Sequence, residues 1–141
     1  MILVDTSALY ALTDRRDQHH KTATSWYAAA REAENTLAIT QLIMAESWCM
    51  VERRKNSFYA DKLWELMLSG FFNILDLDAA DLATSLDIRI KYSDSKMSLV
   101  DATTLAICER LRIKKVFTYD RLHFGLYRPG FTDFLELVPA P

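Results

Sequence analysis

Short apolar segments alternate along this chain with stretches of helical periodicity, and this alternation limits the possible folds more than any other feature of the sequence. Each apolar segment has only four or five residues, which is short for a helix but usual for a strand. We therefore expect strands at residues 1–5, 37–40, 73–77, 115–118 and 134–137.

The stretches between these segments carry apolar residues three or four positions apart, which predicts helices. Asp78 and Ser98 are suitable N-caps, and Gly70 is suited to ending a helix. The expected helices are 6–16 (a short helix or turn), 17–35, 41–55, 57–69, 79–92 and 99–111. Short strands alternating with helices favour the α/β class, as a three-layer α/β/α sandwich around a mostly parallel, roughly five-stranded sheet.

The composition indicates a soluble globular protein, with 50% hydrophobic and 26% charged residues. The length of 141 residues suits a single domain spanning 1–141. No apolar run approaches the roughly 20 residues that cross a membrane, and the early Asp5 argues against a secretory signal, so we expect a cytoplasmic protein. The net charge of −2 is mild evidence against a module that only binds nucleic acid, because such modules usually carry a positive excess.

Two acidic residues directly follow expected strands. Asp5 ends the first strand, and Asp120 comes two residues after Thr118 at the end of the fourth. In open parallel sheets, functional groups gather in the crevice beyond the carboxyl ends of the strands. If both strands are central, we expect these two carboxylates to share that crevice, although Asp5 could instead serve only as a helix cap.

Two further acids lie within apolar helical stretches. Glu46 is flanked one turn away on either side by apolar residues, and Asp101 follows Leu99 and Val100. Burying an unpaired carboxylate is costly, so each must find a partner or line a polar cavity. The alternatives are a salt bridge from Glu46 to Arg53 or Lys62, and simple electrostatics at a helix start for Asp101.

Four converging carboxylates would repel one another, and some would have to bind protons in the absence of a cation. Mg²⁺ and Mn²⁺ prefer oxygen ligands and often bridge to substrate phosphates. Such ions stabilise the charge that develops on a phosphate during hydrolysis. A set of acids without a Cys/His cluster therefore points to phosphodiester chemistry.

The order and spacing of these acids resemble the PIN-domain family. Asp5-Thr6-Ser7 is similar to the family's opening Asp-x-Ser, and Glu46 resembles its helix glutamate. Residues 98–102 are similar to its Ser-x-x-Asp-Ala motif, and residues 118–124 to its Thr-x-Asp-x-x-Phe ending. The resemblance covers nearly every residue and is strongest to the VapC toxins of toxin–antitoxin modules.

The resemblance implies an endoribonuclease that uses Mg²⁺ or Mn²⁺ on tRNA or another structured RNA. It implies that Asp5 and Asp101 are the leading metal ligands, helped by Glu46 and Asp120. It also implies a homodimer and a cognate antitoxin that blocks the site. Ser7 and Thr118 could support the site by hydrogen bonding to the carboxylates or to a metal-bound water, or could serve only turn and strand-end bonding.

Some features leave alternatives open. Leu122 is inserted before His123-Phe124 relative to the family's usual run, and Asp94 could replace or supplement Asp120. The pair His19-His20 favours a solvated helix start over RNA contact. The apolar helix 57–69 favours core packing over a groove for an antitoxin helix.

Other functions remain as alternatives. An aspartyl-nucleophile phosphatase would usually carry a second acid where this chain has Ser7. A nucleotide-binding domain would need a glycine-rich loop after the first strand, and none is present. A housekeeping PIN nuclease and a non-catalytic RNA-binding PIN protein both stay compatible with the sequence.

Overall fold

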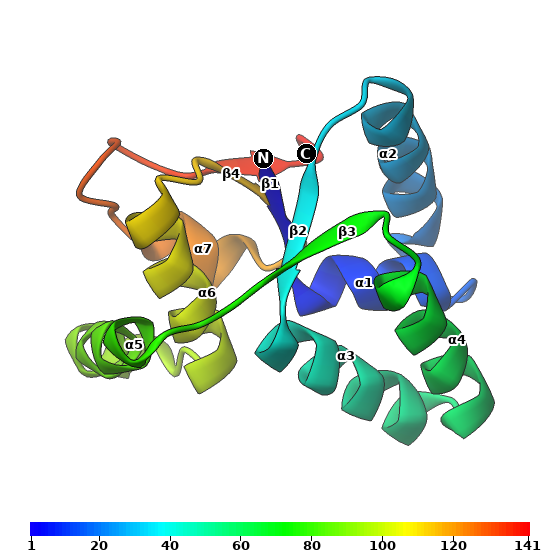
Figure 1. Ribbon diagram of the computed structural model, residues 1–141, viewed down its shortest axis with the longest axis horizontal. Coiled ribbons are helices and arrows are strands. Elements are labelled where there is room, and N and C mark those ends of the chain that lie inside the picture. The colour runs from blue at the N-terminus through cyan, green and yellow to red at the C-terminus, as the bar shows by residue number, and fades with distance from the viewer.

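The computed structural model describes residues 1–141 and contains one five-stranded sheet with helices on both faces (Figure 1). The strand order is β3-β2-β1-β4-β5, and every neighbouring pair is parallel. The expected α/β/α sandwich is confirmed, with a sheet that is entirely rather than mostly parallel. The strands are β1 (Ile2–Val4), β2 (Leu37–Thr40), β3 (Phe72–Leu75), β4 (Lys115–Phe117) and β5 (Glu136–Val138).

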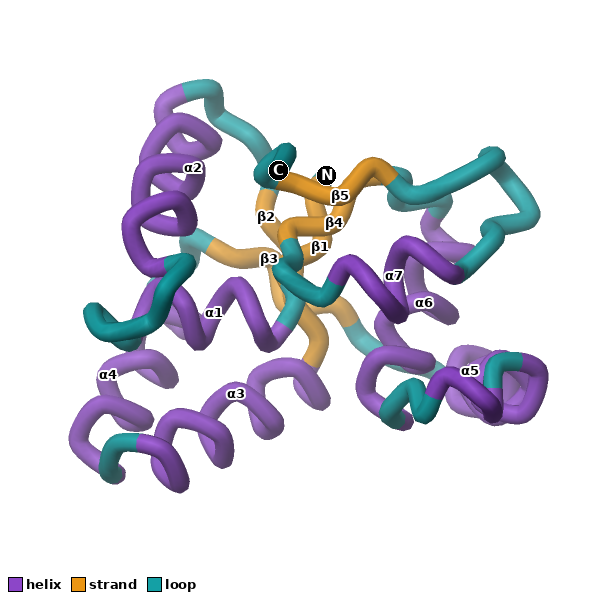
Figure 2. The backbone as a smooth tube through the Cα atoms, turned by 180° about the vertical axis from the view of Figure 1, so that it is seen from behind, coloured by secondary structure: helices purple, strands orange, loops and turns teal.

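The helices divide into two layers that lie on opposite sides of the sheet in Figures 1 and 2. One layer contains α1 (Thr6–Thr13), α2 (His20–Glu32), α3 (Gln41–Arg54) and α4 (Ser57–Leu68). The other contains α5 (Ala79–Lys91), α6 (Leu99–Leu111) and α7 (Arg121–Leu126), with a 3₁₀ helix, Ser93–Ser95, between α5 and α6. None of these helices is both long and apolar enough to cross a membrane.

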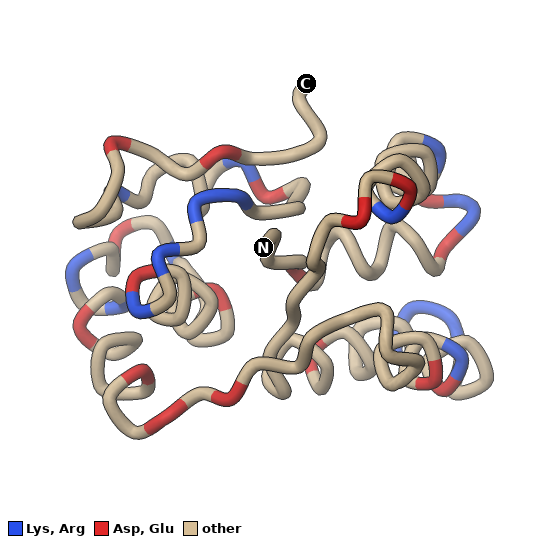
Figure 3. Tube along the Cα trace, turned by 45° about the horizontal axis from the view of Figure 1, so that its top comes forward, with Lys and Arg blue, Asp and Glu red and all other residues tan.

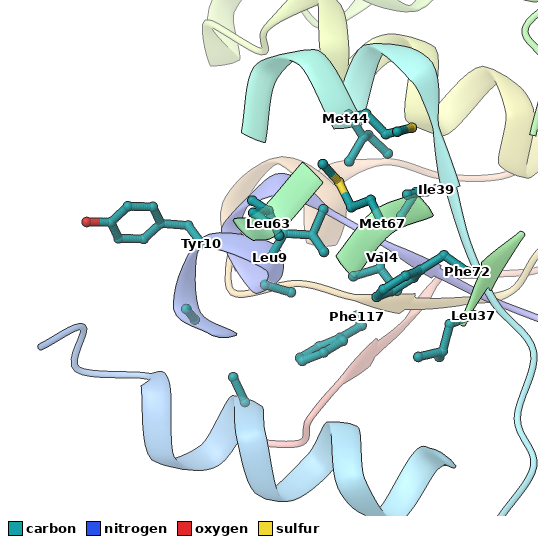
Figure 4. Packing of buried hydrophobic residues seen from close by; sticks show 14 of the residues in the cluster. Val4, Leu9, Tyr10, Leu37, Ile39, Met44, Leu63, Met67, Phe72 and Phe117 are labelled. Atoms are coloured by element: carbon teal, nitrogen blue, oxygen red, sulfur yellow. The ribbon is translucent and has the colours of Figure 1, made fainter. Parts of the chain in front are cut away.

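Successive side chains of the central strands point to opposite faces of the sheet and so fill two separate cores. In β1, Ile2 and Val4 pack into the core shared with α1–α4, whereas Leu3 packs into the core shared with α5–α7. Figure 4 shows the first core, where Val4 and Phe117 from the sheet lie near Leu9 of α1. Because both faces of the sheet are covered, its central strands are apolar on both sides, as parallel strands usually are.

Local capping sets several helix boundaries where the sequence predicts them. Asp78 caps α5 and Ser98 caps α6, each through a reciprocal capping box with the residue three positions on. Gly70 follows α4 with φ = 90°, a conformation that a residue with a Cβ rarely adopts. These caps depend on neighbouring residues only, which is why they can be predicted.

Other boundaries differ from expectation. The helix expected at 17–35 begins at His20, because Asp17 accepts a hydrogen bond from the His19 N–H (2.8 Å) and forms a turn. Helix α7 was not expected, since six residues are too few to show a helical period. The last strand begins at Glu136 instead of Phe134, whose side chain is left exposed.

Candidate metal-binding site

The parallel pairing of β1 with β4 brings the ends of these two central strands together. Asp5 directly follows β1, and its backbone N–H donates to the carbonyl of Phe117, the last residue of β4 (2.9 Å). Thr118 and Asp120 follow at once. The crevice beyond the carboxyl ends of the strands therefore contains the two acids that the sequence places there.

Asp5 is buried, with only 3% of its surface exposed, and its two carboxylate oxygens have unequal surroundings. Oδ2 accepts hydrogen bonds from the hydroxyls of Ser7 (2.8 Å) and Thr118 (2.9 Å), and a longer one from the Ser7 N–H (3.3 Å). Oδ1 is buried and has no hydrogen-bond partner. Burial raises the pKa of Asp5 despite these donors, so the carboxylate is held in place but left short of partners.

The same hydroxyls fix the turn after β4. The Tyr119 N–H donates to Ser7 Oγ (2.9 Å), and the Asp120 N–H donates to Thr118 Oγ1 (2.9 Å). Each hydroxyl thus links Asp5 to the backbone of the segment that carries Asp120. Ser7 and Thr118 connect two strand ends that are far apart in the sequence.

Asp101 lies in the first turn of α6 and completes the capping box with Ser98. Asp101 therefore does have a role at the start of a helix, which was one of the two interpretations of this residue. However, burial and, to a lesser extent, the negative charges of Asp5 and Asp120 together raise the pKa of Asp101 to about 6. A carboxylate placed only to cap a helix would not normally face two other carboxylates.

Asp120 caps the short helix α7 and lies beside His123. Its Oδ1 accepts from the His123 N–H (2.9 Å), and its Oδ2 lies 2.7 Å from His123 Nδ1. The other ring nitrogen, Nε2, lies 2.8 Å from the carbonyl oxygen of Ser95. The hydrogen bond to Asp120 raises the pKa of His123, and the imidazolium form satisfies both oxygen acceptors.

Asp101, Asp120 and His123 form a group of possible ligands, with one ligand atom of each within 4.8 Å of the others. Asp5 and Glu46 are not part of this group and are connected to it only through the effect of the Asp5 charge on Asp101 and Glu46. His123 Nδ1 is also 3.9 Å from Asp101 Oδ2. His123 is not among the residues that the sequence predicts for the site, because the pattern that indicates the site consists of acids alone. Its position three residues after Asp120 could have indicated its place, because a residue in the first turn of a helix lies next to the N-cap residue.

Glu46 is half-buried on α3, which packs against α1 (Figure 2). Burial raises its pKa, and the charge of Asp5 adds to the effect, so Glu46 lies within electrostatic reach of that carboxylate. It forms no ion pair with Arg53 or Lys62, and Lys62 pairs with Glu65 instead. The salt-bridge alternative for Glu46 is therefore wrong.

Asp94 does not join this group. It lies exposed in the 3₁₀ helix before α6 and is absent from the cluster formed by Asp101, Asp120 and His123. Its neighbour Ser95 contributes only a carbonyl oxygen, to His123. Of the two candidates for the fourth acid, Asp120 is the one next to Asp101.

These residues fit a hard divalent cation. Most of the available donors are carboxylate oxygens, which Mg²⁺ and Mn²⁺ prefer. Asp5 contributes an oxygen that is buried without a partner, and a bound cation would satisfy it. The raised pKa values of Asp5, Asp101 and Glu46 have the same cause, which is burial of like charges with no cation of the protein among them apart from His123.

Comparison with known protein families gives one match, to the PIN domain, over residues 2–126. Among curated proteins, the chain is 25% identical over 138 residues to "Ribonuclease VapC26" of Mycobacterium tuberculosis, covering 98% of this chain and 100% of that protein. It is also 25% identical over 120 residues to "23S rRNA-specific endonuclease VapC20" of the same species, covering 85% and 89%.

Solved structures show the same fold. The crystal structure of VapC20 from Mycobacterium tuberculosis, described as a sarcin-ricin loop cleaving toxin, matches with a TM-score of 0.82 at 22% identity, covering 94% of this chain and 98% of that one. A toxin–antitoxin complex from Klebsiella pneumoniae matches with a TM-score of 0.65 at 23% identity, covering 99% and 97%.

Proposed function

The chain belongs to the PIN domain family, and on that basis we propose that it is an endoribonuclease whose Asp5, Glu46, Asp101 and Asp120 bind Mg²⁺ or Mn²⁺. The observation that carries this proposal is the buried, unpartnered Oδ1 of Asp5, whose charge raises the pKa of both Asp101 and Glu46. Without a cation, this arrangement costs free energy, since desolvated like charges lie together. A divalent ion removes that cost.

Asp5 and Asp101 are the leading ligands in this proposal, helped by Glu46 and Asp120. When bound, the cation stabilises negative charge on the phosphate and on the leaving oxygen. Ser7 and Thr118 hold Asp5 in one orientation through their hydroxyl hydrogen bonds. Oriented ligands raise metal affinity, because less order has to be imposed on binding.

His123 acts as a positioning residue for Asp120. The Ser95 carbonyl oxygen fixes the ring from one side, and Nδ1 holds Asp120 Oδ2 from the other. Its positive charge also offsets part of the repulsion between Asp120 and Asp101. Asp101, with a pKa of about 6, releases its remaining proton when a cation binds, as metal ligands generally do.

We infer RNA as the substrate and a toxin–antitoxin role from the relatives, two of which are named as a ribonuclease and an rRNA-specific endonuclease. A structured RNA, of the tRNA or rRNA kind, is the substrate class we expect, and the cytoplasm is where it would be met. The Klebsiella pneumoniae structure is described as a toxin–antitoxin complex, which supports a cognate antitoxin as a partner here.

Two apolar surfaces fit the proposed partners. A cavity of about 380 Å³ lies between α3 and α4, lined mainly by Trp48, Trp64 and Cys49, and suits an antitoxin side chain. On α5, Leu82, Leu86 and Ile90 form an exposed stripe. A second copy of α5 packed against this stripe in the antiparallel direction would bury it on both copies, which suits a homodimer.

The test is cleavage of total RNA by antitoxin-free protein with Mg²⁺ or Mn²⁺, against the same reaction with EDTA. We expect discrete fragments that require the metal and disappear in Asp101→Asn. The matched control is Asp94→Asn, which removes a nearby exposed acid outside the cluster and should cleave normally. Activity that persists in Asp101→Asn or in EDTA would contradict the proposal.

The same assay separates the alternatives. A non-catalytic RNA-binding protein would bind RNA in every variant and cut none of it. A housekeeping nuclease would cleave in the same metal-dependent way, but its expression in cells would not arrest growth. Growth arrest that is relieved by Asp101→Asn would support the toxin role.

A further inference from the structure

An aromatic pair stands at the edge of the acidic site. The rings of His19 and Tyr119 are stacked, with centroids 4.1 Å apart and planes inclined by 12°. Tyr119 lies between Thr118, which bonds Asp5, and Asp120, and its own N–H donates to Ser7 Oγ (2.9 Å). Since consecutive Cα atoms are about 3.8 Å apart, the tyrosine is directly joined to the residues of the candidate metal site.

The tyrosine is held firmly. Its hydroxyl is 2.8 Å from Thr22 Oγ1 on α2 and also donates weakly to the His19 carbonyl oxygen (3.5 Å). Its ring meets Phe117 edge to face at 6.2 Å, and Phe117 in turn packs against Trp26. Tyr119 is therefore a fixed base on which the His19 ring rests.

The His19 ring is available to a ligand. The residue is half-buried, and neither of its ring nitrogens forms a hydrogen bond within the protein. Its neighbour His20 is different, because His20 Nδ1 is bonded to the Ala11 carbonyl oxygen (2.7 Å) and so anchors the start of α2. Of the two adjacent histidines, only His19 has an imidazole without a partner other than the stacked tyrosine.

Exposed cations lie on both sides of His19 in the sequence, although the chain as a whole has a net charge of −2. Arg15 and Arg16, in the loop between α1 and α2, and Lys21, in the first turn of α2, are exposed. The same segment contains two acids, Asp17 and the buried Asp14, which is paired with Lys55. Figure 3 shows that basic and acidic positions are interspersed along the chain. Arg16 makes one long contact with Asp14 (3.6 Å) and keeps 78% of its side chain exposed, so it is free to meet a phosphate.

We propose that His19, supported by Tyr119, is a platform on which an unpaired RNA base stacks while a neighbouring phosphate lies at the acidic site. This inference rests on the proposed function. Aromatic side chains bind unpaired bases of any identity by stacking, and nearby cations hold the backbone. The platform selects a loop, bulge or single-stranded end, because a base within a duplex is already stacked on its neighbours.

The pair favours RNA over an acidic protein partner for one structural reason. Tyr119, the residue that supports His19, directly precedes Asp120 in the sequence. A base stacked on His19 would therefore lie beside the site where a phosphate binds. Arg15, Arg16 and Lys21 then lie where flanking phosphates pass. His19 and His20 lie at the start of α2 and are partly exposed, as the helix-start interpretation expects. In addition, His20 is bonded to Ala11 and His19 is stacked on Tyr119.

Binding is tested in the Asp101→Asn background, which prevents cleavage, by fluorescence anisotropy with a short fluorescein-labelled single-stranded RNA of mixed sequence. We expect His19→Ala to weaken binding roughly 5- to 100-fold, in line with the loss of one stacked base. His19→Phe keeps an aromatic ring and should bind within about twofold of the parent, because stacking tolerates the change of ring. Lys114→Ala, at the opposite end of the sheet, is the control for loss of a cation and should not change the affinity.

The same RNA annealed to its complement should bind equally to parent and His19→Ala. In the cleavage-competent protein, His19→Ala should raise KM with little effect on kcat, because the platform contacts the ground state and the transition state alike. Equal affinities of the parent and His19→Ala for single-stranded RNA would overturn the platform. If His19-dependent binding is present but no metal-dependent cleavage occurs in the protein with all four acids, the platform stands and the proposed nuclease function fails.

Discussion

Asp5 and Asp14 are both buried carboxylates at the ends of helix α1, yet their surroundings are opposite. Asp14 accepts hydrogen bonds from the Tyr10 hydroxyl (2.7 Å), the Arg16 N–H (3.0 Å) and the Lys55 ammonium (3.1 Å). The hydrogen bond from Tyr10, above all, holds the pKa of Asp14 well below its usual range. Asp5 has only neutral donors on one oxygen and none on the other, and burial raises its pKa.

We infer from this difference that Asp14 is a structural acid and that Asp5 is a functional one. At Asp14, the chain supplies its own counterion, Lys55, which links the end of α1 to the end of α3. At Asp5, the chain supplies further acids, and the compensating charge has to come from outside the protein. Burial alone does not mark a functional carboxylate, whereas burial together with a missing partner does.

The largest effect we expect is on cleavage. Asp5→Asn should lower the cleavage rate roughly 1,000-fold or more, because a leading metal ligand is lost. This corresponds to a loss of about 4 kcal/mol or more of transition-state stabilisation. Asp14→Asn should leave the rate per folded molecule unchanged, since Asp14 lies outside the site. Single-turnover cleavage assays on both variants measure this. A comparable loss of rate in Asp14→Asn would remove the distinction between the two acids.

The reverse holds for stability. Asp14→Asn should lower the free energy of unfolding by about 3 kcal/mol, because the buried Lys55 ammonium loses its counterion. Asp5→Asn should cause no such loss, since it removes a charge that no group in the protein compensates. Urea denaturation of the metal-free proteins measures both values. The comparison breaks down if Asp5→Asn is the more destabilising of the two.

Metal binding should stabilise the native protein only through the acidic site. At a Mg²⁺ concentration 100 times its Kd, the free energy of unfolding should rise by about 2.7 kcal/mol. Asp14→Asn should show the same increment from its lower starting value, and Asp5→Asn should show much less. Thermal unfolding with increasing Mg²⁺ measures the increments. Equal increments in all three proteins would indicate that the ion binds elsewhere.

The smallest effect concerns pH in the absence of metal. Because the pKa of Asp101 is about 6 in the folded protein and lower in the unfolded chain, the folded state binds more protons between these values. The contribution of Asp101 to the free energy of unfolding is therefore fully present below the ordinary pKa of 3.8 and is lost as the pH rises through about 6. Asp101→Asn should make this decrease smaller and stabilise the metal-free protein at pH 7 by about 1–2 kcal/mol. The raised pKa values of Asp5 and Glu46 account for the part that remains.

Asp14 should give the opposite slope. Its pKa is lowered by folding, so the stability it contributes is present above the ordinary aspartate pKa and is lost as the pH falls below it. Urea denaturation from pH 3 to 7 on wild type, Asp101→Asn and Asp14→Asn separates the two contributions. A slope between pH 4 and 6 that is as steep in Asp101→Asn as in wild type would contradict the prediction and assign the slope to other groups.

Much of the fold and part of the site could be predicted from short stretches of sequence. The α/β alternation, the caps at Asp78 and Ser98 and the stop at Gly70 depend on residues within one or two turns of each other. The positions of Asp5 and Asp120 after strands could be predicted from the apolar segments that precede them. Helix α7 was missed because its N-cap and six residues leave too little pattern to detect.

Which other residues lie at the site could be identified only from the three-dimensional structure. His123 joins Asp101 and Asp120 because α7 turns it back toward the start of α6, and Asp94 is excluded because its 3₁₀ helix leaves it exposed. No local pattern distinguishes these two residues. His19 likewise became a candidate only when Tyr119, 100 positions later, was found stacked on it.

By itself, the sequence determined which segments form strands and helices and which strand ends carry acids, because periodicity and capping act over a few residues. Only the tertiary structure decided that β1 lies next to β4, so that Thr118 bonds Asp5 across 113 positions and the acids share one crevice. Strand order depends on how the helices cover both faces of the sheet, which is a property of the whole chain. The shortage of partners at Asp5, from which the function is inferred, exists only once that order is in place.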